Sequence, residues 1–348
     1  MKRLERSPLI QLSYSRMIGF LREPEAIFWV FAFPILLALA LGIAFRSSGP
    51  QKSAVAIEQA PGSVAVHAAL AASDRIEVRV LPPAEAALEL RRGRIAVLVR
   101  PEGVHPPTLA FDPARPETRL AQLEVTEALE RAAGRLDRVT PRLENRPRPG
   151  SRYIDFLIPG LIGLNLLGTG MWGVGFPIAN ARQLKLLKRM VATPMRRGDY
   201  LLSLVLARLV WLVLEVVAIV AFGWLAFGVI MRGSWLGFAV VTLIGGLAFT
   251  ALGLLVASRA RTIEGVSGIM NVVMMPMWML SGSFFSSERF PAFMQPFVHA
   301  LPLTACNDAL RALTNEGAGL AATLPEIGIL AAWGVGSFYL ALKLFRWE

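Results

Sequence analysis

Four long stretches of the sequence contain no Asp, Glu, Lys or Arg, and no other feature limits the fold as strongly. A helix rises about 1.5 Å per residue, so crossing a hydrocarbon core of roughly 30 Å takes about 20 residues. With 54% hydrophobic and only 18% charged residues, the chain has too much apolar sequence for one soluble core. The four stretches span residues 27–45, 156–181, 233–258 and 265–287.

Two further stretches meet the length requirement less cleanly. Residues 209–231 are apolar except for Glu215, and residues 327–342 reach full length only when residues 324–326 are added. The sequence therefore predicts an α-helical integral membrane protein with six transmembrane helices. We place these helices at residues 25–45, 153–181, 200–231, 234–258, 264–287 and 323–344.

The distribution of basic residues predicts the orientation of the helices. The net charge of +11 alone would fit nucleic-acid binding, but the charges gather beside the membrane segments, so no nucleic-acid partner is expected. The short connections on one side carry only Arg232, Arg289 and Arg311. The positive-inside rule therefore places both termini in the cytoplasm. The inner flanks hold Lys2, Arg3, Arg6, Arg16, Arg22, Arg182, Lys185, Lys188, Arg189, Arg196, Arg197, Arg259, Arg261, Lys343 and Arg346.

Residues 46–152 differ from the rest of the chain, with short alternating apolar runs, many charges and frequent prolines. This pattern predicts an inserted extracytoplasmic α/β domain between the first and second transmembrane helices. The expected strands cover residues 53–57, 76–81, 95–100 and 108–111, and the expected helices cover residues 64–72, 84–91 and 117–136.

Three shorter segments complete the predicted organisation. Residues 1–24 hold an amphipathic helix in the cytoplasmic interface, which Pro24 ends. Residues 182–199 combine basic and apolar side chains, which predicts a short cytoplasmic amphipathic helix that ends before Pro194. Residues 288–322 are expected to form two short helices folded against the outer membrane surface.

The sequence contains no recognisable catalytic or metal-binding pattern, and we expect a chain that is not an enzyme. Gly168, Gly170 and Gly173 match a dinucleotide-binding string, but they lie within a transmembrane stretch, where small residues favour close helix packing. The chain has no phosphate-binding Gly-x-x-x-x-Gly-Lys-Ser/Thr string, its three histidines are scattered, and Cys306 is its one cysteine. We therefore expect it to bind no metal and no ATP by itself.

Arg208 and Glu215 are charged residues in or near the third predicted span, where a charge is costly and marks a structural or functional site. They are seven residues apart in the sequence, hence on one helix face but about 10 Å apart along the axis. Direct pairing between them therefore requires a side chain that snorkels along the helix. For Glu215, a structural pair with another helix is favoured over a proton relay, while Arg208 either reaches the headgroups or serves the protein interior.

A set of polar, methionine and tryptophan side chains on the second and fifth spans forms a candidate substrate pathway. Methionine adapts to ligands of varied shape. Ordinary helix packing, with one interhelical hydrogen bond for each asparagine, is the alternative interpretation. The candidate residues are Asn165, Thr169, Asn271, Met274, Met275 and Trp278.

Several strings, found in order along nearly the whole chain, resemble those of one known family. They are Leu21-Arg22-Glu23-Pro24, Phe33-Pro34, the segment 187–197, Leu280-Ser281-Gly282-Ser283-Phe284-Phe285, Phe290-Pro291 and Leu301-Pro302-Leu303-Thr304. The chain is similar to type-2 ABC transporter permeases of the subgroup with a large extracytoplasmic domain. One departure is Ala181-Arg182-Gln183, which stands where many relatives carry an acidic residue.

The resemblance implies the transmembrane subunit of an ABC exporter for a hydrophobic or amphiphilic substrate, such as a drug, lipid or lipid-linked molecule. A separate ATP-binding cassette ATPase subunit would bind ATP and Mg, and a second permease chain would complete a homodimer or a paralogous heterodimer. The outer gate of the family falls on Phe284, Phe285, Pro302 and Arg311. Its ATPase-coupling role falls on Arg182, Leu184, Lys185, Leu187, Lys188, Arg189, Met190, Thr193 and Pro194.

The same resemblance implies a multi-pass protein of the bacterial cytoplasmic (inner) membrane, in contact with membrane lipid. A periplasmic partner for the outer domain is left open. Two alternatives also stay open. One is a mechanotransmission-type ABC permease, which has four helices, and the other is a membrane receptor in which the outer domain is the working part.

Overall fold

The computed structural model describes residues 8–45, 52–103, 105–135, 150, 152–186, 189, 197–260 and 262–345. It divides into two compact units, which are described separately. Met1–Arg46 together with Pro147–Glu348 forms the first, called the membrane unit below, and Ser47–Arg146 forms the second, called the α/β unit.

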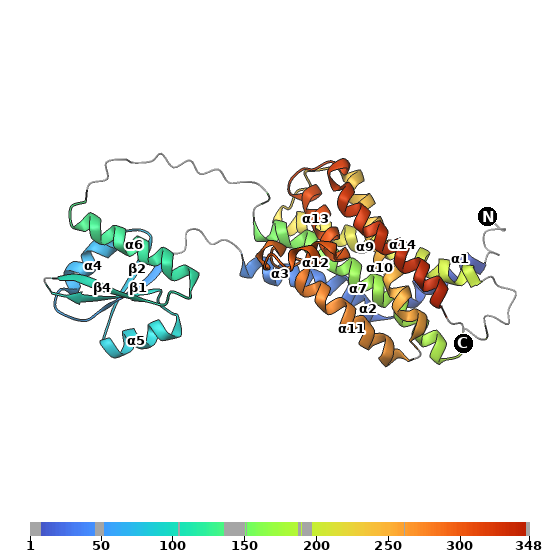
Figure 1. Ribbon diagram of the computed structural model, residues 1–348, viewed down its shortest axis with the longest axis horizontal. Helices are drawn as coiled ribbons and strands as arrows, with labels where there is room; N and C mark the ends of the chain where they lie inside the picture. The colour runs from blue at the N-terminus through green and yellow to red at the C-terminus, as the bar shows by residue number, and fades with distance from the viewer. Residues whose placement is uncertain are drawn as a thin grey trace. The chain divides into compact units, whose positions relative to one another are not determined.

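Six helical segments of the described chain are long and apolar enough to cross a membrane, which confirms the predicted fold class. The first combines α2 (Pro24–Ile27), a π-helical turn at Phe28–Ala32 and α3 (Phe33–Ala44). The others are α7 (Tyr153–Gln183), α9 (Arg197–Phe227), α10 (Trp235–Arg259), α11 (Ile263–Leu280), and α14 (Leu324–Leu344) with the 3-10 turn Leu320–Thr323 before it. Figure 1 shows these helices running roughly alongside one another, with α1 (Pro8–Leu21) at one end of the unit.

Helix α7 is the most enclosed span, and it packs tightly against α10 through glycines. A Cβ atom added at Gly170 would lie 2.8 Å from the Cβ atom of Phe249. One added at Gly253 would lie 2.7 Å from the Cα atom of Met171. Small residues allow such close approach between helices in a membrane, where no water drives association. The α7–α10 contact therefore forms the centre of the membrane unit.

The first span changes from π-helical to α-helical geometry near Pro34, which lacks a backbone N–H group. The π-helical turn precedes it, and the carbonyl of Val30, four residues before Pro34, receives no helical hydrogen bond from the proline. The side-chain amide of Asn165 on α7 donates a hydrogen bond to this carbonyl at 3.3 Å. Asn165 therefore joins the π-helical segment of the first span to the second span.

Two helix ends differ from those expected from hydropathy. Helix α9 ends at Phe227 rather than near residue 231, and α11 ends at Leu280 rather than near residue 287. After α11 the chain turns at Gly282, whose φ of +73° is in the left-handed region. Apolar composition continues past both ends, and for this reason hydropathy alone placed them too late.

Two short helices occur where the sequence predicts them, α12 (Gln295–Ala300) and α13 (Pro302–Thr314). Helix α13 is enclosed by the membrane unit, because Leu303, Cys306, Leu310 and Leu313 are fully buried against its core. It contacts α7, α10 and α14. This helix therefore belongs to the packed bundle and does not simply lie on its surface.

The α/β unit contains a four-stranded sheet in the order β2-β1-β3-β4. Strand β1 (Ser53–Glu58) pairs in parallel with β2 (Ile76–Leu81) and β3 (Val97–Glu102), and β4 (His105–Phe111) is antiparallel to β3. Alternate residues of β1 face opposite cores: Val55 and Ile57 pack with α4 (Ser63–Ala71) and α6 (Pro116–Ala132), while Ala56 packs with α5 (Pro83–Arg92). Figure 1 shows α4 and α6 on one face of the sheet and α5 on the other. The predicted α/β fold is confirmed.

Candidate substrate pocket

The membrane unit contains an open pocket of about 910 Å³, bounded by α1, the first span, α7, α9 and α11. One face of α7 forms its back wall. The contributing residues of this helix recur every three or four positions, from Leu161 to Pro177, which corresponds to about 24 Å along the axis. The pocket is therefore long, and its shape suits an extended ligand.

Aromatic side chains make up a large share of the lining. Phe20 of α1 packs on Trp211 of α9, with ring centroids 4.4 Å apart, and this contact joins α1 to the pocket wall. Aromatic rings offer large apolar surfaces, and the indole N–H adds a polar edge. The aromatic residues that line the pocket are Phe20, Trp29, Phe33, Trp172, Phe176, Trp211, Trp278 and Phe284.

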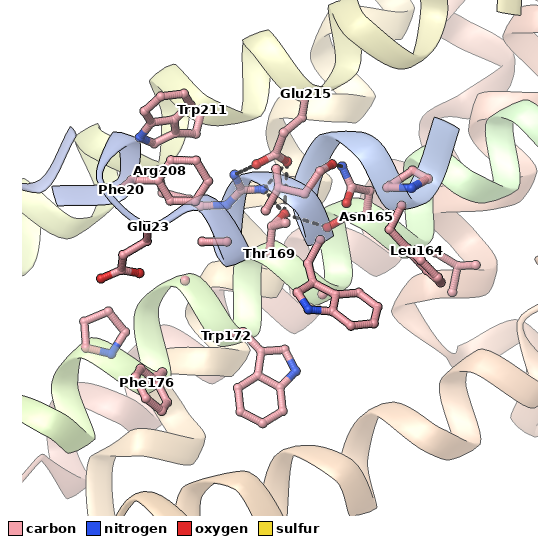
Figure 2. A pocket seen from close by; sticks show the side chains of 18 of the residues that line it. Phe20, Glu23, Leu164, Asn165, Thr169, Trp172, Phe176, Arg208, Trp211 and Glu215 are labelled. Atoms are coloured by element: carbon pink, nitrogen blue, oxygen red, sulfur yellow. Dashed lines mark hydrogen bonds and ion pairs between the residues drawn. The ribbon is translucent and has the colours of Figure 1, made fainter. Parts of the chain in front are cut away.

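Arg208 and Glu215 form a buried ion pair in the pocket wall, with the side-chain extension that direct pairing required. Nη1 of Arg208 lies 2.7 Å from Oε1 of Glu215, and Nη2 lies 3.0 Å from Oε2. Their side chains are only 6% and 1% exposed. The arginine side chain is long enough to extend along the helix axis, which closes the separation that the residue spacing implied. Figure 2 shows the pair beside Thr169.

Thr169 of α7 completes this cluster. Its hydroxyl lies 3.0 Å from Oε2 of Glu215 and 2.5 Å from the carbonyl oxygen of Asn165, and it also accepts a hydrogen bond from Nη2 of Arg208. The cluster ties α7 to α9 and leaves the deep part of the pocket without net charge. The Nε atom of Arg208 is enclosed and has no hydrogen-bond partner among the described residues.

The structure brings four of the six predicted pathway residues to this pocket. Asn165, Thr169, Met274 and Trp278 line it. Asn271 and Met275 do not, and both are exposed on another face of α11. The pathway assignment itself stays a prediction, now attached to a defined cavity.

The structure describes only some of the predicted coupling residues. Leu187, Lys188, Met190, Thr193 and Pro194 lie outside the described residues, while Leu184, Lys185 and Arg189 are exposed.

Arg182, also predicted to couple to the ATPase, has a buried guanidinium that caps the end of α10. It donates to the carbonyl oxygens of Ala257 at 2.9 Å and Ser258 at 3.3 Å, and also to that of Ala260. A cation near these last carbonyls also complements the helix dipole. Arg182 therefore joins the end of α7 to the end of α10.

The predicted gate residues divide between two places. Phe284 lines the pocket, whereas Phe285 is 61% exposed, and Pro302 begins α13. Arg311 of α13 donates from Nη2 to the carbonyl of Gly282 at 2.5 Å, and its guanidinium lies 3.7 Å from the ring centre of Phe156.

Arg311 keeps its charge in this partly buried position. Burial lowers the pKa of Arg311 to about 10, while nearby Asp308 acts in the opposite direction, so the guanidinium stays charged near neutral pH. Asn307, one turn before it, donates to the hydroxyl of Ser283 at 2.9 Å. These bonds fasten α13 to the chain that follows α11.

Sequence reasoning missed most of the aromatic lining and the contribution of α1. A signal was present, since Trp172 and Phe176 share a helix face with Asn165 and Thr169 at spacings of three and four residues. Phe20 and Trp211 could not be assigned in this way, because their meeting depends on how α1 packs against α9.

Six candidate spans among the described residues, with an aromatic-lined pocket beside them, define a polytopic membrane protein. The model of the family described as ABC-2 type transporter matches residues 130–314, which is more than half of the chain. The chain belongs to the ABC-2 type transporter family and is its transmembrane permease. Permeases of this family work with an ATP-binding subunit, and ATP hydrolysis belongs to that subunit.

Several curated proteins are similar to this chain. Nodulation protein J of Bradyrhizobium diazoefficiens is 28% identical over 201 residues, which cover 57% of this chain and 75% of that protein. Inner membrane transport permease YhhJ of Escherichia coli is 28% identical over 119 residues, covering 34% of this chain and 32% of that protein. Linearmycin resistance permease protein LnrN of Bacillus subtilis is 26% identical over 186 residues, covering 51% of this chain and 46% of that protein. The chain thus spans three quarters of the first and less than half of the other two.

Proposed function

We propose that this permease is the transmembrane subunit of an exporter that moves a hydrophobic or amphiphilic substrate, such as a drug, lipid or lipid-linked molecule. The pocket along α7 is the observation that carries the proposal. It is long, lined mainly by apolar and aromatic side chains, and large enough for a ligand of considerable size. Its only deep charges, among the described residues, are the mutually paired Arg208 and Glu215.

The proposed orientation places both termini in the cytoplasm and the α/β unit on the outer side of a bacterial inner membrane. The concentration of basic residues on one side of the spans supports it. The similarity to a protein named as an inner membrane transport permease agrees with this location. With this orientation, the chain fits the subgroup of permeases that carry an extracytoplasmic domain.

Two such chains and two ATP-binding subunits form the proposed complex, as a homodimer or a paralogous heterodimer of permeases. ATP and Mg bind to the ATPase subunits, which dock at the coupling segment from Arg182 to Pro194. Because Arg182 is bonded to the end of α10, movement of this segment is transmitted to α7 and α10 together. A periplasmic partner for the α/β unit remains part of the proposal.

The alternative of a mechanotransmission permease fits less well, because that class has four helices and the described residues already contain six candidate spans. A receptor would not require a pocket that extends deep between the spans, although the α/β unit leaves this role open.

Filling the pocket tests the proposed function. Gly168 faces the pocket, and a Cβ atom added there would meet only the terminal carbon of Met274, at 4.0 Å. Gly168→Phe should therefore occupy the cavity without displacing the backbone. We expect at least about a tenfold loss of amphiphile-stimulated ATP hydrolysis by the reconstituted complex, with basal hydrolysis retained.

The control is Gly328→Phe on α14, where the added side chain enters open space away from the pocket. Its stimulation should equal that of the wild type. If Gly168→Phe is folded and is still stimulated fully, the pocket does not carry the substrate.

A further inference from the structure

The charges that line the pocket differ between its deep part and its mouth. The deep pair, Arg208 and Glu215, is internally neutral. Arg16, within α1, and Glu23, between α1 and α2, line the same pocket. Figure 2 shows Glu23 lying apart from the Arg208–Glu215 pair.

A second cavity of about 460 Å³ shares Glu23, Ala26 and Trp29 with the pocket and is also lined by Arg22 and Glu25. The two cavities therefore meet at Glu23. Of the charged residues, Glu23 lines both cavities, Arg16 lines the first alone, and Arg22 and Glu25 line the second alone. Below, the mouth of the pocket means the region lined by these four residues.

These four charges are available to a ligand. Within the part of the chain that the structure describes, Arg22, Glu23 and Glu25 make no ion pair, and all three side chains are exposed. Arg16 donates from Nε to the hydroxyl of Ser203 at 3.2 Å and lies over the ring of Tyr200. Its two terminal nitrogens make no hydrogen bond to another described residue.

The arrangement discriminates between ligand charges. A headgroup with a single negative charge is attracted by the two arginines but repelled by the two glutamates. A cationic headgroup is attracted by the glutamates and repelled by the arginines. A headgroup with both charges gains from both pairs. Deeper in the pocket an ionised group would find no unpaired counter-charge, because Arg208 and Glu215 neutralise each other, so the charged head stays at the mouth.

We propose that the mouth formed by Arg16, Arg22, Glu23 and Glu25 binds the zwitterionic headgroup of an amphiphile whose apolar chain lies along the α7 face of the pocket. The anionic group of the head contacts the arginines, and its ammonium group contacts the glutamates. This inference rests on the proposed function and specifies the substrate class of the same pocket.

Displacement of a fluorescent probe tests the inference. Pyrene-labelled lysophosphatidylcholine is bound to the purified full-length protein in detergent, and energy transfer from the pocket tryptophans reports occupancy. Three competitors with the same acyl chain are zwitterionic lysophosphatidylcholine, anionic lysophosphatidylglycerol and a cationic acylcholine. We expect the zwitterion to displace the probe at about tenfold lower concentration than either of the others.

Charge variants at exposed positions supply the decisive comparison. Glu23→Gln combined with Glu25→Gln should make the anionic competitor the strongest, and Arg22→Gln should shift the preference toward the cation. A purely structural role would not reverse the order in this way. Equal displacement by all three competitors in the wild type, or an order unchanged in the variants, would overturn the inference.

The zwitterion can be an exported substrate or a resident membrane lipid, and ATP turnover separates these sources. In the reconstituted complex, a substrate is released from the site during hydrolysis, whereas a resident lipid stays bound; both results uphold zwitterion binding.

Failure of the proposed function is recognised separately. It is shown by full stimulation of the Gly168→Phe complex, whereas loss of charge preference alone contradicts only this inference.

Discussion

Arg208 and Glu215 show how a charged pair is accommodated inside a membrane bundle. Each charge alone would be costly in an apolar surrounding, and each is almost completely buried. The two bonds between them, together with the hydroxyl of Thr169, supply the compensation. Removing one member leaves the other charge enclosed without its partner.

A double-mutant cycle tests this account. Glu215→Leu should lower the free energy of unfolding by about 3–5 kcal/mol, because it leaves the Arg208 guanidinium buried and unpaired. Combining it with Arg208→Met removes both charges and should recover most of that loss. Equilibrium unfolding in detergent measures each value. If the double variant is as unstable as the sum of the single variants, the pair does not act as a unit.

At the residue scale, the sequence indicated which side chains matter better than it indicated how they meet. Asn165 and Thr169 were predicted to line a substrate pathway, with helix packing as the alternative. The structure places both at the pocket and gives each a hydrogen-bond partner on another helix. The Arg208–Glu215 bond was not favoured because residue spacing measures the separation of Cα atoms, and pairing depends on the arginine side chain extending along the helix. Asn271 has the same chemistry as Asn165 but faces away from the pocket, which only tertiary packing decides.

At the scale of elements, glycines set the distance between α7 and α10. Helix α7 forms the back wall of the pocket, and both helices contribute to the core. A Cβ atom added at Gly253 would lie 2.7 Å from both the Cα atom and the carbonyl oxygen of Met171. These are backbone atoms, so the helices themselves must separate.

Gly253→Ala is therefore expected to destabilise the protein by about 1–3 kcal/mol, in the range usual for overpacked cores. Gly328→Ala is the matched control, since it lies in another spanning helix with nothing within 4 Å of the added atom. It should be neutral or slightly stabilising, because alanine is a better helix former than glycine. Thermal unfolding of both variants in one detergent measures the difference; equal stability of the two would show that the α7–α10 contact is looser than described.

Existence of the helices was predictable from apolar length, but their ends were not. The charge-free stretch continues through residues 281–285, yet the helix stops at Leu280. Gly282 turns the chain with a φ of +73°, and Asn307 and Arg311 of α13 bond to this turn. Such bonds come from residues more than twenty positions away, so local sequence does not reveal them. The strands of the α/β unit were easier to predict, since alternation of side chains is a local signal.

At the scale of the whole molecule, the chain contains two units with separate cores. The core of the α/β unit is formed by its own strands and helices, with Val55, Ile57, Leu70, Val97 and Val125 fully buried. It needs no residue of the membrane unit for this burial, so it should fold alone.

A fragment comprising residues 52–135 tests this prediction. We expect a soluble protein with mixed helix and strand content by circular dichroism and a single cooperative unfolding transition. Gly103→Ala, at a turn where φ is +66°, should lower its stability by about 1 kcal/mol, because alanine is strained in that region. A fragment that lacks cooperative unfolding would mean that the unit depends on the rest of the chain.

ATP is proposed to drive an amphiphile through the pocket along α7. ATP-dependent movement of a fluorescent zwitterionic amphiphile across the membrane of proteoliposomes, which contain the permease and its ATP-binding subunit, tests it most directly. The wild type and Gly328→Phe should transport at equal rates, and Gly168→Phe should be slower by at least about tenfold. Transport by folded Gly168→Phe at the wild-type rate would contradict the account.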